Sequence, residues 1–194
     1  MQAAGGASLN GAGETADSDD HEDQRRPTAE ARSRWRRPRL LLVAVALVGY
    51  VVDVSTKVLA VARLQDRPDV PVVGDLLVLH LVRNPGAAFS TGTEYTVVLS
   101  LISIAAVVAI CVAALRVRSN AWGVALGVLL AGVAGNLTDR ILRSPGPLRG
   151  HVIDFLMLPN WPVFNVADIC INLAAALIIV LAFRGIRLDG TRVA

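Results

Sequence analysis

The sequence predicts an all-α polytopic membrane protein, with four transmembrane helices and a small extracytoplasmic β-like segment between the first and second. Of its 194 residues, 54% are hydrophobic and 18% are charged, a balance too apolar for an ordinary soluble domain. Four apolar stretches are long enough to cross a hydrocarbon core about 30 Å thick, which takes about 20 helical residues. They cover residues 40–61, 95–115, 121–138 and 166–183.

Arginines flank these stretches unevenly and predict their orientation. With both chain ends in the cytoplasm, 12 arginines lie inside and six outside, in agreement with the positive-inside rule. The net charge of +3 then reflects topology and contact with anionic membrane lipid. No base-reading motif accompanies it, so we expect no nucleic-acid partner.

The first 38 residues contain an acidic run and then a basic run, with little that folding could bury. We expect residues 1–38 to be a disordered cytoplasmic tail, with Trp35 as an interfacial anchor. Residues 39–184 are the predicted membrane domain, and residues 185–194 a cytoplasmic C-terminal tail. A cleaved signal peptide fits less well, because the first apolar stretch is too long for one and contains Asp53 and Lys57.

Residues 63–94 are the first outer segment. Its stretch PVVGDLLVLHLVRN alternates loosely and is rich in Val and Leu, which predicts one or two short strands. The motif NPGAAF (residues 84–89) follows, where small residues permit close backbone approach and Asn84 supplies donors and an acceptor. An ordinary turn explains Asn-Pro-Gly equally well.

Polar residues within the spans occur at helical spacing. Asp53 and Lys57 share one helix face, either as an ion pair that permits insertion or as a brace for a site. Asn136, Asp139 and Arg140 share a face of the third span. An ion pair between Asp139 and Arg140 at the helix end is the structural alternative for that group.

The third and fourth spans carry two further patterns. Gly132 and Gly135 permit close helix packing. Asn165, Asp168 and Asn172 fall at i, i+3 and i+7, so we expect a polar stripe that points into the helix bundle.

Asp154 and Asp168 lie just before and just inside the fourth span, 14 positions apart. Because burying a carboxylate at membrane depth costs several kcal/mol, two of them indicate a function. If they face each other across the intervening proline-containing turn, they can share one proton, as in an aspartic protease. A plain helix-start carboxylate is the alternative for Asp168.

Residues for other chemistries are missing from the sequence. Cys111 and Cys170 fall inside predicted spans as small hydrophobes, and His80 and His151 stand alone in separate loops. We therefore expect no metal and no cofactor. Neither a nucleophile elbow nor a phosphate-binding loop is present.

Five motifs occur in the order DVSTK (53–57), NPGAAF (84–89), GNLTDR (135–140), VIDF (152–155) and FNVAD (164–168). Over residues 40–183 the chain thereby resembles the type II signal peptidases, the lipoprotein signal peptidases of bacteria. The resemblance implies an aspartic endopeptidase of the cell membrane, without cofactor, with prolipoproteins as substrates. Such an enzyme removes their signal peptide by cutting before the diacylglyceryl-modified cysteine.

The resemblance also assigns residues. It implies that Asp154 and Asp168 are the catalytic dyad. The residues that match the family's supporting set are Asp53, Lys57, Asn84, Asn136, Asp139, Arg140 and Asn165. We expect a monomer whose active site lies toward the extracytoplasmic side.

Some positions depart from the family pattern. Val54 stands where Gln is common, Pro85 where Thr is common, and Ala131 where a pair of glycines usually begins. The stretch between Arg140 and Asp154 looks longer than in compact members.

Two other functional classes also place polar residues inside spans. A small transporter or proton-coupled channel would use intramembrane Asp, Lys and Asn as an ion path. Here those residues cluster toward the outer ends of the spans, which predicts no path across the membrane. A noncatalytic assembly factor would use the glycine-rich third span as its interface, and it leaves the two aspartates unexplained.

Overall fold

The computed structural model describes residues 29–86 and 94–192, without the side chains of residues 29–35 and 94. Its contacts divide the chain after Ser33, and the description below concerns the unit Arg34–Ala194. The side chain of the expected anchor Trp35 and residues 87–89 of the NPGAAF motif lie outside the described residues.

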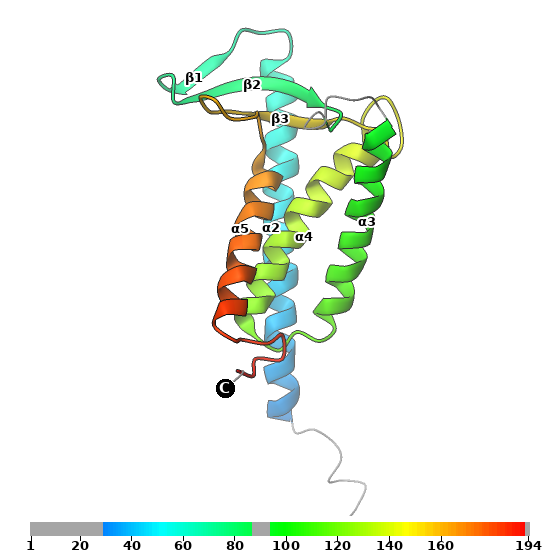
Figure 1. The fold of residues 1–194 in the computed structure, drawn as a ribbon, viewed down its shortest axis with the longest axis vertical. Coiled ribbons are helices and arrows are strands. Elements are labelled where there is room, and N and C mark those ends of the chain that lie inside the picture. The colour runs from blue at the N-terminus through cyan, green and yellow to red at the C-terminus, as the bar shows by residue number, and fades with distance from the viewer. Residues whose placement is uncertain (1–28, 87–93, 193–194) are drawn as a thin grey trace, which may run out of the picture. The chain divides into compact units, whose positions relative to one another are not determined.

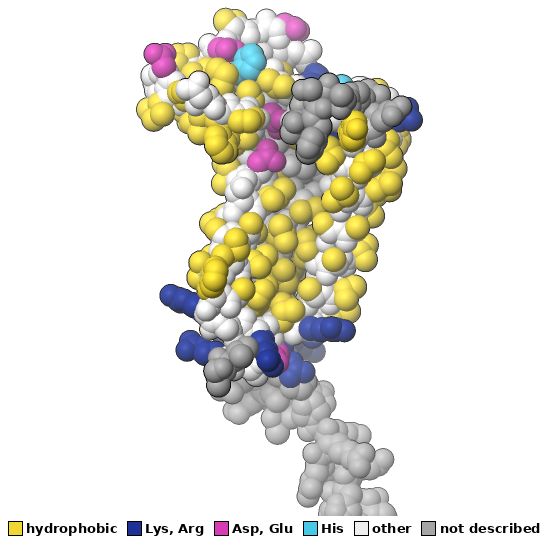
Figure 2. Space-filling view, in the orientation of Figure 1, with side chains coloured by type: hydrophobic (Ala, Val, Ile, Leu, Met, Phe, Trp, Pro, Cys, Tyr) yellow, Lys and Arg dark blue, Asp and Glu magenta, His cyan; other side chains and the backbone are white. Residues whose placement is uncertain are grey.

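Four helices in the described part of the chain are long and apolar enough to cross a membrane, which confirms the predicted class. They form a bundle (Figure 1). They are α2 (Ala29–Leu64), α3 (Glu94–Ala114), α4 (Asn120–Leu142) and α5 (Val166–Phe183). In the space-filling view, apolar side chains cover the helical surface, and Lys and Arg gather at the end away from the sheet (Figure 2).

Two helices are longer than the sequence indicates. α2 begins at Ala29, not near residue 40, so residues 29–38 of the expected tail are helical and residues 1–28 lie outside the described residues. Arginine is a good helix former, and the backbone of Pro38 packs closely on Gly123 of α4. α4 continues to Leu142, so Asp139 lies in its last turn.

A three-stranded antiparallel sheet lies across one end of the bundle (Figure 1). Strands β1 (Val70–Val73) and β2 (Leu77–Asn84) confirm the strands predicted between the first two spans. The third strand, β3 (Val152–Met157), comes from the connection between α4 and α5 and was not predicted. Ile153 and Phe155 of β3 pack on Leu64 of α2, which holds the sheet against the helix end.

The residues after α5 pack against the connection between α3 and α4. The carbonyl oxygen of Leu188 accepts a hydrogen bond from the backbone N–H of Arg118 at 2.9 Å. Trp122 Nε1 donates to the carbonyl oxygen of Ile186 at 2.8 Å. The first residues of the expected C-terminal tail are therefore hydrogen-bonded to the membrane domain.

Small residues bring α4 close to its neighbours. A Cβ on Gly132 would lie 2.5 Å from a backbone oxygen of α5, and one on Gly135 would overlap the carboxylate of Asp53. The close packing predicted from these two glycines is confirmed. Ala131 is accommodated by Gly49 of α2, where an added Cβ would lie 2.7 Å from the Cβ of Ala131.

Gly49→Ala should therefore lower the unfolding temperature of the detergent-solubilised protein, because overpacking costs about 1–3 kcal/mol. The double variant G49A/A131G removes the opposing methyl group and should recover most of the lost stability. Thermal unfolding of both variants beside the wild type measures this. If G49A unfolds at the wild-type temperature, or if the second substitution lowers it further, the proposed contact is wrong.

Candidate active site

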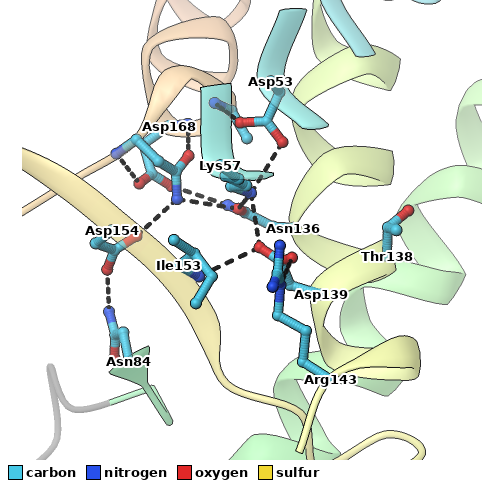
Figure 3. Close-up of polar contacts among 12 residues, drawn as sticks. Asp53, Lys57, Asn84, Asn136, Thr138, Asp139, Arg143, Ile153, Asp154 and Asp168 are labelled. Atoms are coloured by element: carbon cyan, nitrogen blue, oxygen red, sulfur yellow. Dashed lines mark hydrogen bonds and ion pairs between the residues drawn. The ribbon is translucent and has the colours of Figure 1, made fainter. Parts of the chain in front are cut away.

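The two aspartates predicted as a dyad lie at the sheet end of the bundle, Asp154 in β3 and Asp168 in the first turn of α5 (Figure 3). The structure brings the supporting residues to the same place. Hydrogen bonds and ion pairs connect Asp53, Lys57, Asn84, Asn136, Asp139 and Asn165 to one another or to the dyad. The predicted site is thus one connected network from α2, β2, α4, β3 and α5.

Asn165 joins the two acids. Its Nδ2 donates to Asp154 Oδ1 at 2.6 Å, and its backbone N–H donates to Asp168 Oδ2 at 3.1 Å. Its Oδ1 accepts from the backbone N–H of Asp168 at 3.0 Å, which completes a capping box at the start of α5. Asn165 is 0% exposed, so water does not compete for these bonds. The start of α5 thereby fixes Asp168 and a donor to Asp154 together.

Asp154 is buried and receives a donor on each carboxylate oxygen. Asn84 Nδ2 donates to Oδ2 at 2.8 Å, while Asn165 occupies Oδ1. Burial raises the pKa of Asp154 to about 6, and the nearby charge of Asp168 acts in the same direction, whereas the two amide donors act against it. Asp154 is the member of the pair whose surroundings favour the protonated form.

The NPG turn orients Asn84 toward the dyad. Asn84 Oδ1 accepts from the backbone N–H of Gly86 at 2.8 Å, so the Nδ2 end of the amide is directed to Asp154. Gly86 has φ +108°, a conformation that favours glycine. The buried Thr96 of α3 donates to the carbonyl oxygen of Pro85 at 2.5 Å and holds the turn in place. The motif forms a turn, and this turn places the Asn84 amide against Asp154.

Asp168 is half-buried and surrounded by N–H donors. Asn136 Nδ2 donates to Oδ1 at 2.9 Å, and the backbone N–H of Asn165 donates to Oδ2. The N-terminus of α5 also favours negative charge at this position. These contacts fix the orientation of the Asp168 carboxylate.

Lys57 is 1% exposed, and its ammonium group contacts two carboxylates and one amide oxygen. Nζ lies 2.9 Å from Asp53 Oδ2, 3.0 Å from Asp139 Oδ2 and 2.8 Å from Asn136 Oδ1. Because Asn136 Oδ1 accepts from Lys57, its Nδ2 is directed to Asp168 (Figure 3). The pairing of Asp53 with Lys57 is confirmed, and the pair also braces the site.

Each carboxylate that pairs with Lys57 also accepts a hydrogen bond from a backbone N–H next to a dyad acid. Asp53 Oδ1 accepts from the backbone N–H of Ala167 at 2.8 Å, one residue before Asp168. Asp139 Oδ2 accepts from the backbone N–H of Ile153 at 3.2 Å, one residue before Asp154. α2 and α4 are thereby connected to the two catalytic candidates.

Arg140 lies beside the dyad without a salt bridge to it among the described residues. Its charge interacts with those of Asp154, Asp168 and Asp139. Nε and Nη1 are buried and have no hydrogen-bond partner in the described part of the chain. The alternative pairing of Asp139 with Arg140 is wrong, because the ion-pair partners of Asp139 are Lys57 and Arg143.

Within residues 29–86 and 94–192, no three His, Cys, Asp or Glu residues are placed to hold a metal ion. Cys111 and Cys170 are free thiols. The polar side chains gathered at the site are carboxylates, amides and cations.

Comparison with known proteins agrees with this arrangement. The profile of the family described as Signal peptidase (SPase) II matches residues 45–184. The chain belongs to the signal peptidase II family. The lipoprotein signal peptidase of Mycobacterium avium (strain 104) is 48% identical over 165 residues, which are 84% of this chain and 91% of the relative. The lipoprotein signal peptidase of Streptomyces griseus subsp. griseus is 44% identical over 158 residues, which are 81% of this chain and 81% of the relative.

A solved structure, described as a bacterial membrane enzyme at 1.9 Å resolution, has the same fold. Its TM-score is 0.66 at 24% identity, over 74% of this chain and 92% of that chain. The family profile and the two lipoprotein signal peptidases confirm the resemblance that the five motifs indicate.

In this signal peptidase II family member, one residue of the network was not predicted and one predicted residue lies outside it. Arg143, whose Nε pairs with Asp139 Oδ1, follows that aspartate by four positions, a spacing that could have identified it. Asn172 was expected to point into the bundle and is exposed instead. Exposure of the three polar residues therefore increases along the chain, from buried Asn165 through half-buried Asp168 to exposed Asn172.

Lys57→Met should destabilise the fold far more than Arg143→Met. Removing Lys57 leaves two buried carboxylates without their shared cation, which costs about 3–5 kcal/mol. Arg143 is 24% exposed and pairs with one carboxylate, so its loss should cost about 1 kcal/mol or less. Unfolding by SDS titration in mixed micelles measures both variants, and equal losses would contradict the central position of Lys57.

Proposed function

We propose that this family member is an aspartic endopeptidase of the cell membrane. Its substrates are prolipoproteins, from which it removes the signal peptide by cutting before the diacylglyceryl-modified cysteine. The observation that carries the proposal is the bridge through Asn165, which holds two carboxylates of different character side by side. Burial favours a protonated Asp154, while N–H donors and the helix N-terminus favour an ionised Asp168.

The reaction follows from these two states. Ionised Asp168 takes a proton from a water molecule, whose oxygen attacks the carbonyl carbon of the scissile peptide bond. Asp154 donates its proton to the departing nitrogen, which becomes the new amino terminus of the lipoprotein when the C–N bond breaks. The signal peptide leaves with the new carboxyl group, and one proton exchange between the acids and solvent restores the starting states.

Arg140 is the candidate for substrate binding in this site. Its Nε and Nη1 are buried and have no partner among the described residues, so they are available as donors for the carbonyl oxygens of an extended peptide. Its positive charge near Asp154 and Asp168 also limits the repulsion between them. No cofactor enters the reaction.

The diacylglyceryl group positions the substrate in this proposal. Acyl chains that stay in the bilayer hold the modified cysteine at a fixed depth, which brings the scissile bond to the dyad at high effective concentration. We place both termini in the cytoplasm and the dyad toward the extracytoplasmic side, since arginines gather at the end of the bundle away from the sheet. The enzyme acts as a monomer, because one chain supplies both acids.

Asp154→Asn and Asp168→Asn should each abolish cleavage of a diacylglyceryl-modified prolipoprotein by the purified enzyme. An amide fills the same space but can neither accept nor deliver the proton. Both variants should still fold, as judged by thermal unfolding, because Asn keeps one oxygen acceptor. Turnover above about 1% of wild type in either variant would refute the roles given to these acids.

The rate should fall as pH rises above about 6, where Asp154 loses its proton. Asn84→Ala removes a donor that stabilises ionised Asp154, so its pKa should rise and the alkaline limb of the profile should move to higher pH. The pH dependence of kcat/KM measures both effects, with Asn120→Ala at the far end of α4 as the matched control. If the alkaline limb of the Asn84→Ala profile stays in place or moves to lower pH, the assignment of Asp154 as the acid is contradicted.

A further inference from the structure

Asn172 is a polar residue on the outward face of an apolar helix. It lies in α5 one turn beyond Asp168, and its side chain is exposed. Its neighbours on the helix surface, Ile169 and Leu173, are also exposed, as expected where a helix faces hydrocarbon. Polar side chains at such positions are rare in membrane helices, because hydrocarbon offers them no hydrogen bonds.

Within the described part of the chain, the Asn172 amide has a hydrogen-bond partner at its nitrogen and none at its oxygen. Nδ2 donates to the backbone carbonyl oxygen of Asp168 at 2.9 Å. The same bond fixes the direction of the amide, since a carbonyl oxygen can accept only from the NH₂ end. Among the described residues no donor reaches Oδ1. An exposed hydrogen-bond acceptor therefore lies on the surface of α5 one turn from Asp168.

The proposed substrate brings a donor to this level of the membrane. A peptide must be extended to be cut, and an extended segment in hydrocarbon has backbone N–H groups without partners, each costing several kcal/mol. This inference rests on the proposed function, in which signal-peptide residues upstream of the cut lie deeper in the bilayer than the scissile bond.

The distance between Asp168 and Asn172 along α5 indicates which substrate residue can reach Asn172. Four helical residues from Asp168 amount to about 6 Å along α5. An extended peptide advances about 3.3 Å per residue, so this distance corresponds to about two residues. The upstream chain can therefore pass Asn172 soon after it leaves the dyad.

We propose that Asn172 is a substrate-binding residue, whose Oδ1 accepts a backbone N–H of the signal peptide about two residues upstream of the cut. The bond holds the chain extended where it enters the site and lowers KM. It is made equally before and during the reaction, so it leaves kcat nearly unchanged. The residue thus adds a backbone contact on the membrane side of the dyad.

Paired changes in enzyme and substrate test this contact. The enzymes are wild type, Asn172→Ala and, as a control, Ser103→Ala, whose hydroxyl makes a similar bond to a backbone carbonyl four residues earlier on α3. The substrates are diacylglyceryl prolipoprotein peptides in which one backbone N–H, at each of the first four upstream residues in turn, is replaced by an ester oxygen. The readouts are kcat and KM for every pair in the same proteoliposomes.

Asn172→Ala should raise KM about three- to tenfold with kcat nearly unchanged, the size of one hydrogen bond, while Ser103→Ala should leave both constants at wild-type values. One ester peptide should show a similar loss with the wild type and no further loss with Asn172→Ala. Unchanged KM in Asn172→Ala, or independent losses at all four esters, would overturn the inference. A wild-type enzyme that leaves the unaltered peptide uncut would overturn the proposed function and this inference with it.

Discussion

The arrangement of the site depends on Asn165. A helix start needs an N-cap, and here the cap residue bonds to both catalytic candidates, through its side chain to Asp154 and through the capping box to Asp168. Two carboxylates would otherwise repel one another and separate. Because the cap is formed by folding of α5 itself, the dyad is assembled whenever that helix is docked. The hydrogen bonds of Asn165 therefore both start helix α5 and hold the two carboxylates in place.

A second requirement is charge balance away from water. Lys57 offsets the charges of Asp53 and Asp139, and each of those carboxylates holds the backbone beside one dyad acid. In the described residues, all the buried charged groups belong to this network. The described residues of the bundle hold no buried charge outside this network, which suits a helical protein in lipid. These features favour a peptidase over a transporter.

Local patterns in the sequence predicted the four spans, the strands after the first span and the pairing of Asp53 with Lys57, because each depends on neighbouring residues. Strand β3 escaped prediction because its partner strand is about 70 residues away, and an apolar run there looks the same whether paired or not. Helical spacing placed Asn172 on the side of Asp168 but could not tell which way that side faces. The alternative ion pair between Asp139 and its neighbour Arg140 does not form, and Arg143, four positions after Asp139, pairs with that carboxylate instead.

The most direct measurement compares a prolipoprotein peptide in its diacylglyceryl form with the same peptide carrying an unmodified cysteine. Both are incubated with purified enzyme in the same proteoliposomes at equal membrane-bound concentration, and the products are identified by mass spectrometry. A dyad that acts on a lipid-anchored substrate predicts a single cut before the cysteine, made far faster in the diacylglyceryl peptide. Equal rates for the two peptides, or cuts at other bonds, would contradict a lipoprotein signal peptidase and indicate a less selective protease.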